Sequence, residues 1–353
     1  MRSSACLRLF LIAAFLAAPG AVRAWNYPGH RLVNQVALAS LPGDFPAWIH
    51  TPENAERIAF LAGEPDRWRN THVELLQHYN GLDHYIDLEE IGYAGMDVAT
   101  LPQFRYDFAV QFAAGRAAHL DLFPKPDPEK DRAAGHPGNE DHSLEWSGFL
   151  PWAIAEYYAK IQSAFSYLKA FEQAGTPAEI ANARANLIYM MGVMGHYVGD
   201  GAQPLHATVH HHGWVGPNPE GFSTKYGFHS WIDGGFIAKA GITEAELLPR
   251  ATPAETIDVA PRPDGRDPVF VSVVDYLVGT GKLVAPLYRL EKERKLEGPG
   301  PDSAEGRAFI DAQLLRGGEM LGSLWLTAWR HSPPDTYLRS DLLRRSAKKP
   351  ATP

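Results

Sequence analysis

Apolar positions recur at helical spacing along most of the chain. Between residues 151 and 171 they stand three or four apart, at Ile154, Tyr157, Tyr158, Ile161, Phe165 and Leu168. The same spacing predicts a helix over 176–199, a short one from 243, and two long ones over 269–296 and 303–329. The helices from 176 and 243 each open on a capping box, Thr176 with Glu179 and Thr243 with Glu246. Because strand-like alternation is scarce, the pattern predicts an all-α domain.

Three segments interrupt this pattern. Residues 124–140 are rich in proline, glycine and charge and predict an exposed insertion, and residues 298–302 separate two helices. Residues 339–353 carry five basic side chains and predict a frayed, disordered tail. Contact of this tail with phosphates or lipid headgroups is the alternative.

The first 24 residues have the composition of a secretory signal. Arg2 and Arg8 give a positive start, residues 9–18 an apolar core, and residues 22–24 a small-residue cleavage site. A membrane anchor is the other interpretation, but the apolar run is too short to span a bilayer. We expect cleavage after Ala24, a mature domain over 25–338 that starts at Trp25, and a secreted or bacterial periplasmic protein.

Composition narrows the possible chemistry. The only cysteine, Cys6, lies in the predicted signal, so the mature chain has no disulfide and no sulfur ligand for a metal. That chain retains 30 basic and 41 acidic residues, a net charge of −11. A basic groove for nucleic acid is therefore not predicted, and an anionic substrate needs another source of attraction.

Histidine and aspartate stand four apart at His196 and Asp200, and again at His229 and Asp233. Residues four apart share one face of a helix, although a single such pair also arises by chance in a chain with 15 histidines. Gly192, Gly195 and Gly199 recur beside His196 and predict a close approach by another group. Tight helix packing with a solvated helix end explains the same glycines.

Further polar residues surround these pairs in the sequence. His206 follows Asp200 after a short turn, and His30 stands five residues after Trp25. Asp66 precedes Arg69 by three positions, and the run from 84 to 87 reads His84, Tyr85, Ile86 and Asp87. Each has an ordinary explanation when it is taken singly, such as a buried polar residue, a surface turn or a surface salt bridge.

In this order and spacing, the motifs resemble the trinuclear-zinc family of single-strand-specific nucleases of fungi and plants, the S-one/P-one type. That family shares its fold with bacterial zinc-dependent phospholipase C. The matching residues lie between Trp25 and about residue 235, so the final third of the chain carries less of the resemblance.

The resemblance implies a compact multi-helix domain that holds three zinc ions. One ion would be bound by Asp66, His84, His196 and Asp200, and a second by His206, His229 and Asp233. The third would take the amine and carbonyl of Trp25, the ring of His30, and Asp200 as a bridge. Nitrogen and oxygen ligands suit catalytic zinc, and the ions would make the pocket cationic within an acidic protein.

The resemblance also implies a reaction and a substrate. Asp66, Asp200 and Arg69 would be catalytic, with Arg69 balancing charge on the phosphoryl oxygens. Tyr85 and Asp87 would bind a nucleobase by stacking and hydrogen bonding. The expected activity is hydrolysis of the 3′ O–P bond of single-stranded DNA, RNA and 3′-nucleotides to 5′-phosphates, by a monomer that needs no protein partner.

Two features depart from the family pattern. The gap between His84 and His196 is unusually long, so residues 93–150 include an insertion beside the predicted site. Residues His210 to His212 are also unusual, and we expect them to lie in an exposed loop. Phospholipase C activity on lipid headgroups therefore stays the alternative, followed by a secreted zinc-binding or adhesive protein without turnover.

Overall fold

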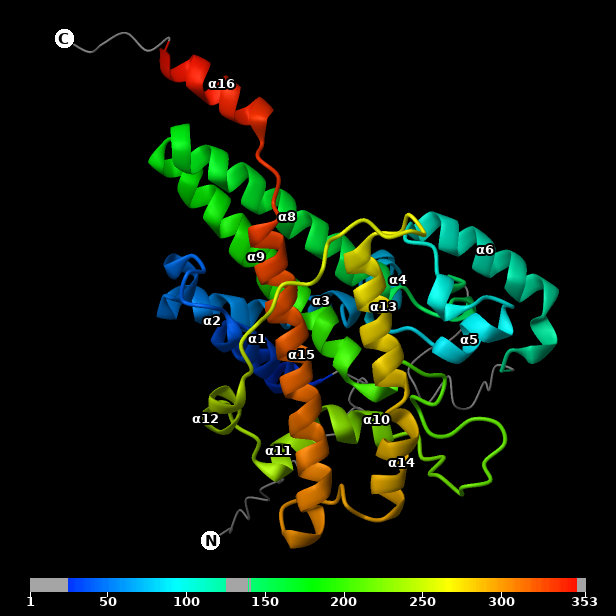
Figure 1. The fold of residues 1–353 in the computed structure, drawn as a ribbon. Helices are drawn as coiled ribbons and strands as arrows, with labels where there is room; N and C mark the ends of the chain where they lie inside the picture. The colour runs from blue at the N-terminus through cyan, green and yellow to red at the C-terminus, as the bar shows by residue number, and fades with distance from the viewer. Residues whose placement is uncertain (1–24, 125–138, 140, 348–353) are drawn as a thin grey trace, which may run out of the picture.

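The chain folds into helices, as the computed structural model shows for residues 25–124, 139 and 141–347 (Figure 1). The described residues contain no β-strand. The α-helices are α1 Tyr27–Ser40, α2 Pro52–Leu61, α3 Glu64–Arg69, α4 Glu74–Gly81, α5 Leu88–Tyr93, α6 Arg105–Ala118, α8 Leu150–Ala174, α9 Pro177–Ala202, α10 Phe228–Ser230, α11 Ile237–Ala240, α12 Glu244–Leu247, α13 Pro268–Gly281, α14 Val284–Lys292, α15 Ala304–Arg330 and α16 Thr336–Ala347. The all-α prediction is confirmed, and the predicted signal, residues 1–24, lies outside the described residues.

Four long helices, α1, α8, α9 and α15, enclose one hydrophobic core (Figure 1). Helix α9 packs on the other three and is the element that reaches the predicted site. It begins with the predicted capping box, in which the Thr176 hydroxyl accepts from Glu179 N at 3.3 Å and the Glu179 carboxylate accepts from Thr176 N at 2.8 Å. The C-terminal half of α9 is buried, so its polar residues face the protein interior.

The predicted helix over 269–296 is two helices. Helix α13 ends at Gly281 and α14 begins at Val284, and the break follows from a turn in which Leu283 N donates to Thr280 O at 2.9 Å. The Thr280 hydroxyl donates to Gly201 O at 2.6 Å and ties α13 to the end of α9. By length and apolar composition, the run Pro268–Lys292 could span a membrane. Half of its most apolar window is buried inside the domain.

The prediction of a disordered tail is wrong for residues up to Ala347. Helix α16 spans Thr336–Ala347, and the remaining residues, 348–353, lie outside the described part. Leu342 is buried, and the Arg345 guanidinium donates two hydrogen bonds to Glu179, at 2.6 and 2.8 Å. Burial of Leu342, the ion pair of Arg345 with Glu179 and a hydrogen bond from Arg339 Nε to Gln173 Oε1 at 2.7 Å therefore hold a segment whose basic composition suggested fraying.

The predicted insertion, residues 93–150, contributes α6 and short 3₁₀ turns (Figure 1). Phe108 and Phe112 of α6 are fully buried, and Phe108 stacks on Trp152 of α8 at 4.1 Å between ring centroids. Residues 125–138, the centre of the predicted exposed stretch, lie outside the described residues. The described part of this segment is therefore packed against the core by its aromatic side chains.

Candidate metal centre

The C-terminal turns of α9 carry the first histidine–aspartate pair. His196 and Asp200 are fully buried, and His196 Nε2 lies 3.3 Å from Asp200 Oδ2. The alternative of a solvated helix end is therefore wrong. The expected close approach is confirmed: a Cβ on Gly199 would lie 2.8 Å from the His30 ring, and one on Gly195 would lie 1.6 Å from Asn34. The glycines thus let α1 bring His30 against α9.

One group of ligand atoms comes from Asp66 on α3, His84 at the end of a 3₁₀ turn, and His196. His196 Nε2 lies 2.9 Å from His84 Nδ1 and 4.0 Å from Asp66 Oδ1. Asp200 Oδ2 lies 3.0 Å from His84 Nδ1, which adds the fourth predicted residue. On its other side, His196 Nδ1 lies 2.7 Å from Ala62 O, and this contact fixes the orientation of the ring.

A second group consists of His206, His229 and Asp233, as the sequence predicted. His229 Nε2 lies 3.0 Å from His206 Nε2 and 3.1 Å from Asp233 Oδ2. Gln203 Nε2 donates to Asp233 Oδ1 at 2.6 Å, and His206 Nδ1 lies 2.6 Å from His84 O. Asp233 stands in a π-helix, Trp231–Phe236, a rare conformation that occurs often at functional sites.

The third group brings His30 together with His196 and Asp200. His30 Nε2 lies 3.4 Å from Asp200 Oδ1, and its ring stacks on that of His196 at 3.8 Å between centroids. Trp25 is buried, and its indole N–H donates to Gly199 O at 2.8 Å. An indole N–H is a hydrogen-bond donor and not a metal ligand, so only the main-chain atoms of Trp25 could bind a metal, as the resemblance implies.

The donor set fits metal ions. Buried polar atoms in proteins are almost always hydrogen-bonded, yet several atoms here accept or donate no hydrogen bond among the described residues. They are His30 Nδ1 and Nε2, His84 Nε2, Asp200 Oδ1, His229 Nδ1 and Asp233 Oδ2. These atoms belong to the three groups that can hold a metal ion, and other buried atoms elsewhere, such as Asn34 Oδ1 and Trp325 Nε1, also lack a hydrogen bond. Imidazole nitrogen and carboxylate oxygen are ligands that zinc accepts, so bound ions would satisfy these atoms.

Burial also sets the protonation of the ligands. It lowers the pKa of His30, His206 and His229, and that of His84 to about 3. These rings are therefore neutral at pH 7, which is the form that binds metal. Burial alone would raise the pKa of the Asp200 carboxyl, but His196, whose own pKa is raised, and hydrogen bonds from His196 and His84 outweigh it and hold the Asp200 pKa well below its usual range. Asp200 is thus an anion at the junction of the groups.

Arg69 lies at the edge of this cluster. Its Nη2 donates to Asp66 Oδ1 at 2.9 Å, and the two side chains are only 19% and 11% exposed. The surface-turn interpretation of Asp66 is therefore wrong, because the carboxylate is buried beside the histidines. The Arg69 guanidinium therefore binds directly to Asp66, one of the candidate metal ligands.

The predicted base-binding pair, Tyr85 and Asp87, follows directly after His84. Asp87 N donates to Ser147 O at 2.7 Å, and the Tyr85 hydroxyl lies 3.4 Å from Trp146 O. Asp87 is 6% exposed, and burial raises the pKa of its carboxyl. The segment before α8 thus forms one wall beside these two residues, which places the end of the insertion next to the candidate centre.

The expectation that residues 210–212 form an exposed loop is wrong. His210, His211 and His212 are half-buried, and His211 Nδ1 lies 3.8 Å from Asp87 Oδ1. The His211 ring also lies 6.4 Å from that of Tyr85, and the His212 ring 5.6 Å from that of His229. Three successive histidines just after His206 were the available sequence signal for this placement. The contact between His211 and Asp87 joins two distant segments, and only the fold brings them together.

Comparison of the chain with protein-family models, curated proteins and solved structures finds no match. The resemblance to the single-strand nucleases therefore rests on the motifs and on the way they converge.

Proposed function

We propose that this protein is a zinc-dependent phosphodiesterase that hydrolyses single-stranded nucleic acid. The observation that carries the proposal is the convergence of eight side chains in three buried groups that can each hold a metal ion: His30, Asp66, His84, His196, Asp200, His206, His229 and Asp233. They come from distant parts of the chain, and several of their ligand atoms make no hydrogen bond among the described residues. A purely structural role does not account for so many buried polar atoms without a hydrogen bond in one cluster.

In this proposal the centre holds three zinc ions, with main-chain atoms of Trp25 completing the site at His30. When bound, zinc acts as a Lewis acid and lowers the pKa of water to about 7, which supplies hydroxide at neutral pH. Asp200 spans the groups and keeps His84 and His196 in place. The cluster also explains how a chain of net charge −11 attracts phosphate, because the cationic charge would be local.

The remaining roles belong to side chains around the cluster. Arg69, held by Asp66 at 2.9 Å, is placed to stabilise negative charge that develops on the phosphoryl oxygens. Tyr85 offers an aromatic face for a base, and Asp87 accepts a hydrogen bond from its edge. His211 lies against both residues and positions them. The products would be 5′-phosphates, and 3′-nucleotides would also be substrates.

Phospholipase C activity is the second candidate, and a separate observation favours it. Several large apolar side chains are exposed, among them Leu75 on α4 (83%) and Tyr106 and Val110 on α6 (83% and 70%). An enzyme that works at a lipid surface benefits from such residues. Tyr85, Asp87 and the spacing of Asp66 and Arg69 favour the nuclease.

We further propose that the protein is secreted or periplasmic and acts as a monomer, with Trp25 as its first residue after removal of residues 1–24. An exported enzyme meets extracellular nucleic acid and zinc without competition from cytosolic thiols.

A side-by-side assay tests the function. Zinc-loaded mature protein is given single-stranded DNA, RNA, a 3′-nucleotide and phosphatidylcholine, with Arg69→Lys as the variant that keeps charge but loses the forked geometry. The proposal predicts release of 5′-nucleotides and a drop in kcat for Arg69→Lys. Phosphocholine release with untouched nucleic acids would support the second candidate, and zinc binding without any turnover would support a binding protein.

A further inference from the structure

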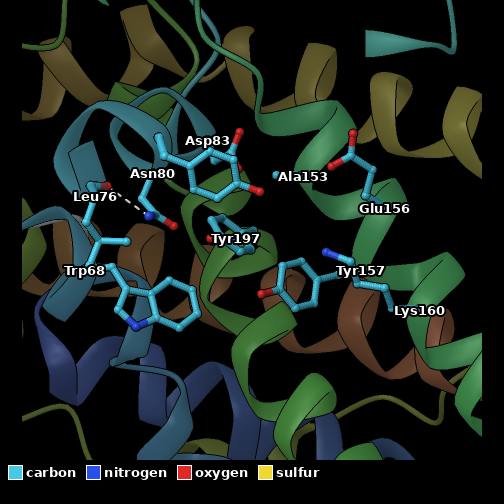
Figure 2. A pocket seen from close by; sticks show the side chains of 10 residues that line it. Trp68, Leu76, Asn80, Asp83, Ala153, Glu156, Tyr157, Lys160 and Tyr197 are labelled. Carbon is cyan, nitrogen blue, oxygen red and sulfur yellow. Dashed lines mark hydrogen bonds between the residues drawn. The ribbon is translucent and has the colours of Figure 1, made fainter.

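A pocket lies between α3, α4, α8 and α9, next to the candidate metal centre (Figure 2). It has a volume of about 240 Å³, and its aromatic lining consists of Trp68, Tyr79, Tyr157 and Tyr197. We call it the tyrosine pocket. It is smaller than the ~300–1,000 Å³ sites of drug-sized ligands, so it suits a single ring system.

The tyrosine pocket shares a wall with the metal centre. The Tyr197 ring lies 5.7 Å from the ring of His84 and 5.7 Å from that of His196, and on its other side it meets the Tyr157 ring at 5.4 Å. Two more lining residues, Trp68 and Asp83, are chain neighbours of Arg69 and His84. A group bound in the pocket would therefore be one layer of side chains away from the candidate ligands.

Polar atoms in the pocket offer a hydrogen-bonding edge. Tyr157 and Tyr197 both line the pocket, and each carries a hydroxyl that can donate or accept a hydrogen bond. Asn80 Nδ2 donates to Leu76 O at 2.9 Å, which leaves the side-chain oxygen as an acceptor. Asp83, 8% exposed, uses Oδ1 for Arg105 at 2.6 Å and keeps a second oxygen.

The side-chain charges around the pocket balance. Asp83 and Glu156 pair with Arg105, and Lys160 Nζ lies 4.3 Å from the Tyr157 ring centroid, where a cationic ligand would otherwise sit. Two carboxylates and two cations leave no net charge, so the pocket favours neither an anionic nor a cationic ligand. A flat, uncharged ring with N–H donors on its edge fits the pocket, because the ring can stack on the aromatic side chains and donate hydrogen bonds to Asp83 and Asn80.

We infer that the tyrosine pocket holds one base of a nucleic-acid strand, away from the phosphate that reacts. This inference rests on the proposed function, since that function supplies the strand. Base stacking on aromatic side chains is tolerant of sequence, so such a pocket would strengthen the binding of strands over mononucleotides without selecting a base. The exposed ring of Tyr79, 72% accessible, stands where a base would enter.

The test measures binding apart from hydrolysis. A fluorescent single-stranded oligonucleotide with uncharged methylphosphonate linkages is titrated against zinc-loaded wild type, Tyr79→Ala and Tyr337→Ala. Tyr337 is the matched control, since it is 81% exposed on α16. We expect Tyr79→Ala to raise the Kd about tenfold, the effect of losing one base–aromatic stack, and Tyr337→Ala to leave it unchanged. Equal melting temperatures would show that the variants are folded.

The outcomes separate this inference from the proposed function. If the wild type cleaves DNA but Tyr79→Ala binds the oligonucleotide as tightly as wild type, the pocket inference is overturned and the nuclease proposal stands. If no nucleic acid is cleaved but Tyr79→Ala still weakens binding, the pocket inference stands without the catalytic proposal.

Discussion

At the scale of single residues, the absence of a side chain matters as much as its presence. Asn34 on α1 is buried, and its Nδ2 donates to Ile58 O at 2.8 Å and to Gly192 O at 3.0 Å. Those bonds join α1, α2 and α9 at the level of Gly195. The contact holds α1, and with it His30, close to His196. The geometry of the candidate ligands therefore depends on Gly195, which is not itself a ligand.

Gly195→Ala should destabilise the protein. The added Cβ would lie 1.6 Å from Asn34 Oδ1, and Asn34 cannot move without losing its two hydrogen bonds. Overpacking of this kind costs about 1–3 kcal/mol in the free energy of unfolding, measured by urea denaturation. Gly92→Ala is the control, because nothing lies within 4 Å of its Cβ. Equal stability of the two variants would show that α1 and α9 are not packed as described.

Residue spacing singled out the pairs His196 with Asp200 and His229 with Asp233, because residues four apart share a helix face, and the family resemblance implied the other candidate ligands. Spacing did not reveal His211, whose contact with Asp87 joins segments far apart in the chain. Nor did it reveal the tyrosine pocket, since Tyr79, Tyr157 and Tyr197 come from three different helices. Local patterns show which side chains share an element, and only packing shows which elements meet.

At the scale of elements, the helix starts were predictable and some of the ends were not. Capping boxes at Thr176 and Thr243 mark helix starts through local hydrogen bonds. The division between α13 and α14 follows from a turn at Lys282 and Leu283, in an apolar run that continues across it. Helix α16 depends on a partner, Glu179, at the start of another helix. Such ends are set by tertiary contacts.

The pair of Glu179 and Arg345 predicts a pH dependence. The hydrogen bonds from Arg345, with those from Thr176, lower the pKa of the Glu179 carboxyl from its ordinary 4.5 to about 2. Because the pKa is depressed in the folded state, the stabilisation is present above pH 4.5 and is lost as the pH falls towards 2. Glu179→Gln should therefore lower the melting temperature most at neutral pH, and the difference from wild type should shrink in that acidic window.

Thermal melts followed by circular dichroism across this pH range check the prediction. Glu255→Gln is the control, because Glu255 is exposed and makes no ion pair among the described residues. A difference between Glu179→Gln and wild type that stayed constant down to pH 2 would show that the carboxylate does not contribute through its charge.

At the scale of the whole molecule, the fold brings the first and the last candidate site residues in the sequence together beside α9. Asn26 N donates to Asp233 O at 2.8 Å, so the first described residues lie against the second ligand group. The core is continuous, which holds the contributing elements in one body. In this arrangement the start of the mature chain is part of the proposed centre.

Extension of the mature N-terminus should therefore remove one metal ion. A chain with two added residues before Trp25 keeps every side-chain ligand but loses the free amine proposed to bind the ion at His30. Mass spectrometry of metal content should show one zinc fewer than in the chain that begins at Trp25. Identical zinc content in the two chains would mean that the amine is not a ligand.

The central claim is that the buried histidines and aspartates form a zinc centre, and a zinc titration followed by native mass spectrometry tests it most directly. Wild type, Asp200→Asn and Asp311→Asn are compared; Asp311 is also buried but pairs with Arg250 outside the cluster. We predict three zinc ions in the wild type and in Asp311→Asn, and fewer in Asp200→Asn. A folded wild type that binds no zinc, or an Asp200→Asn variant that binds as many ions as the wild type, would contradict the account.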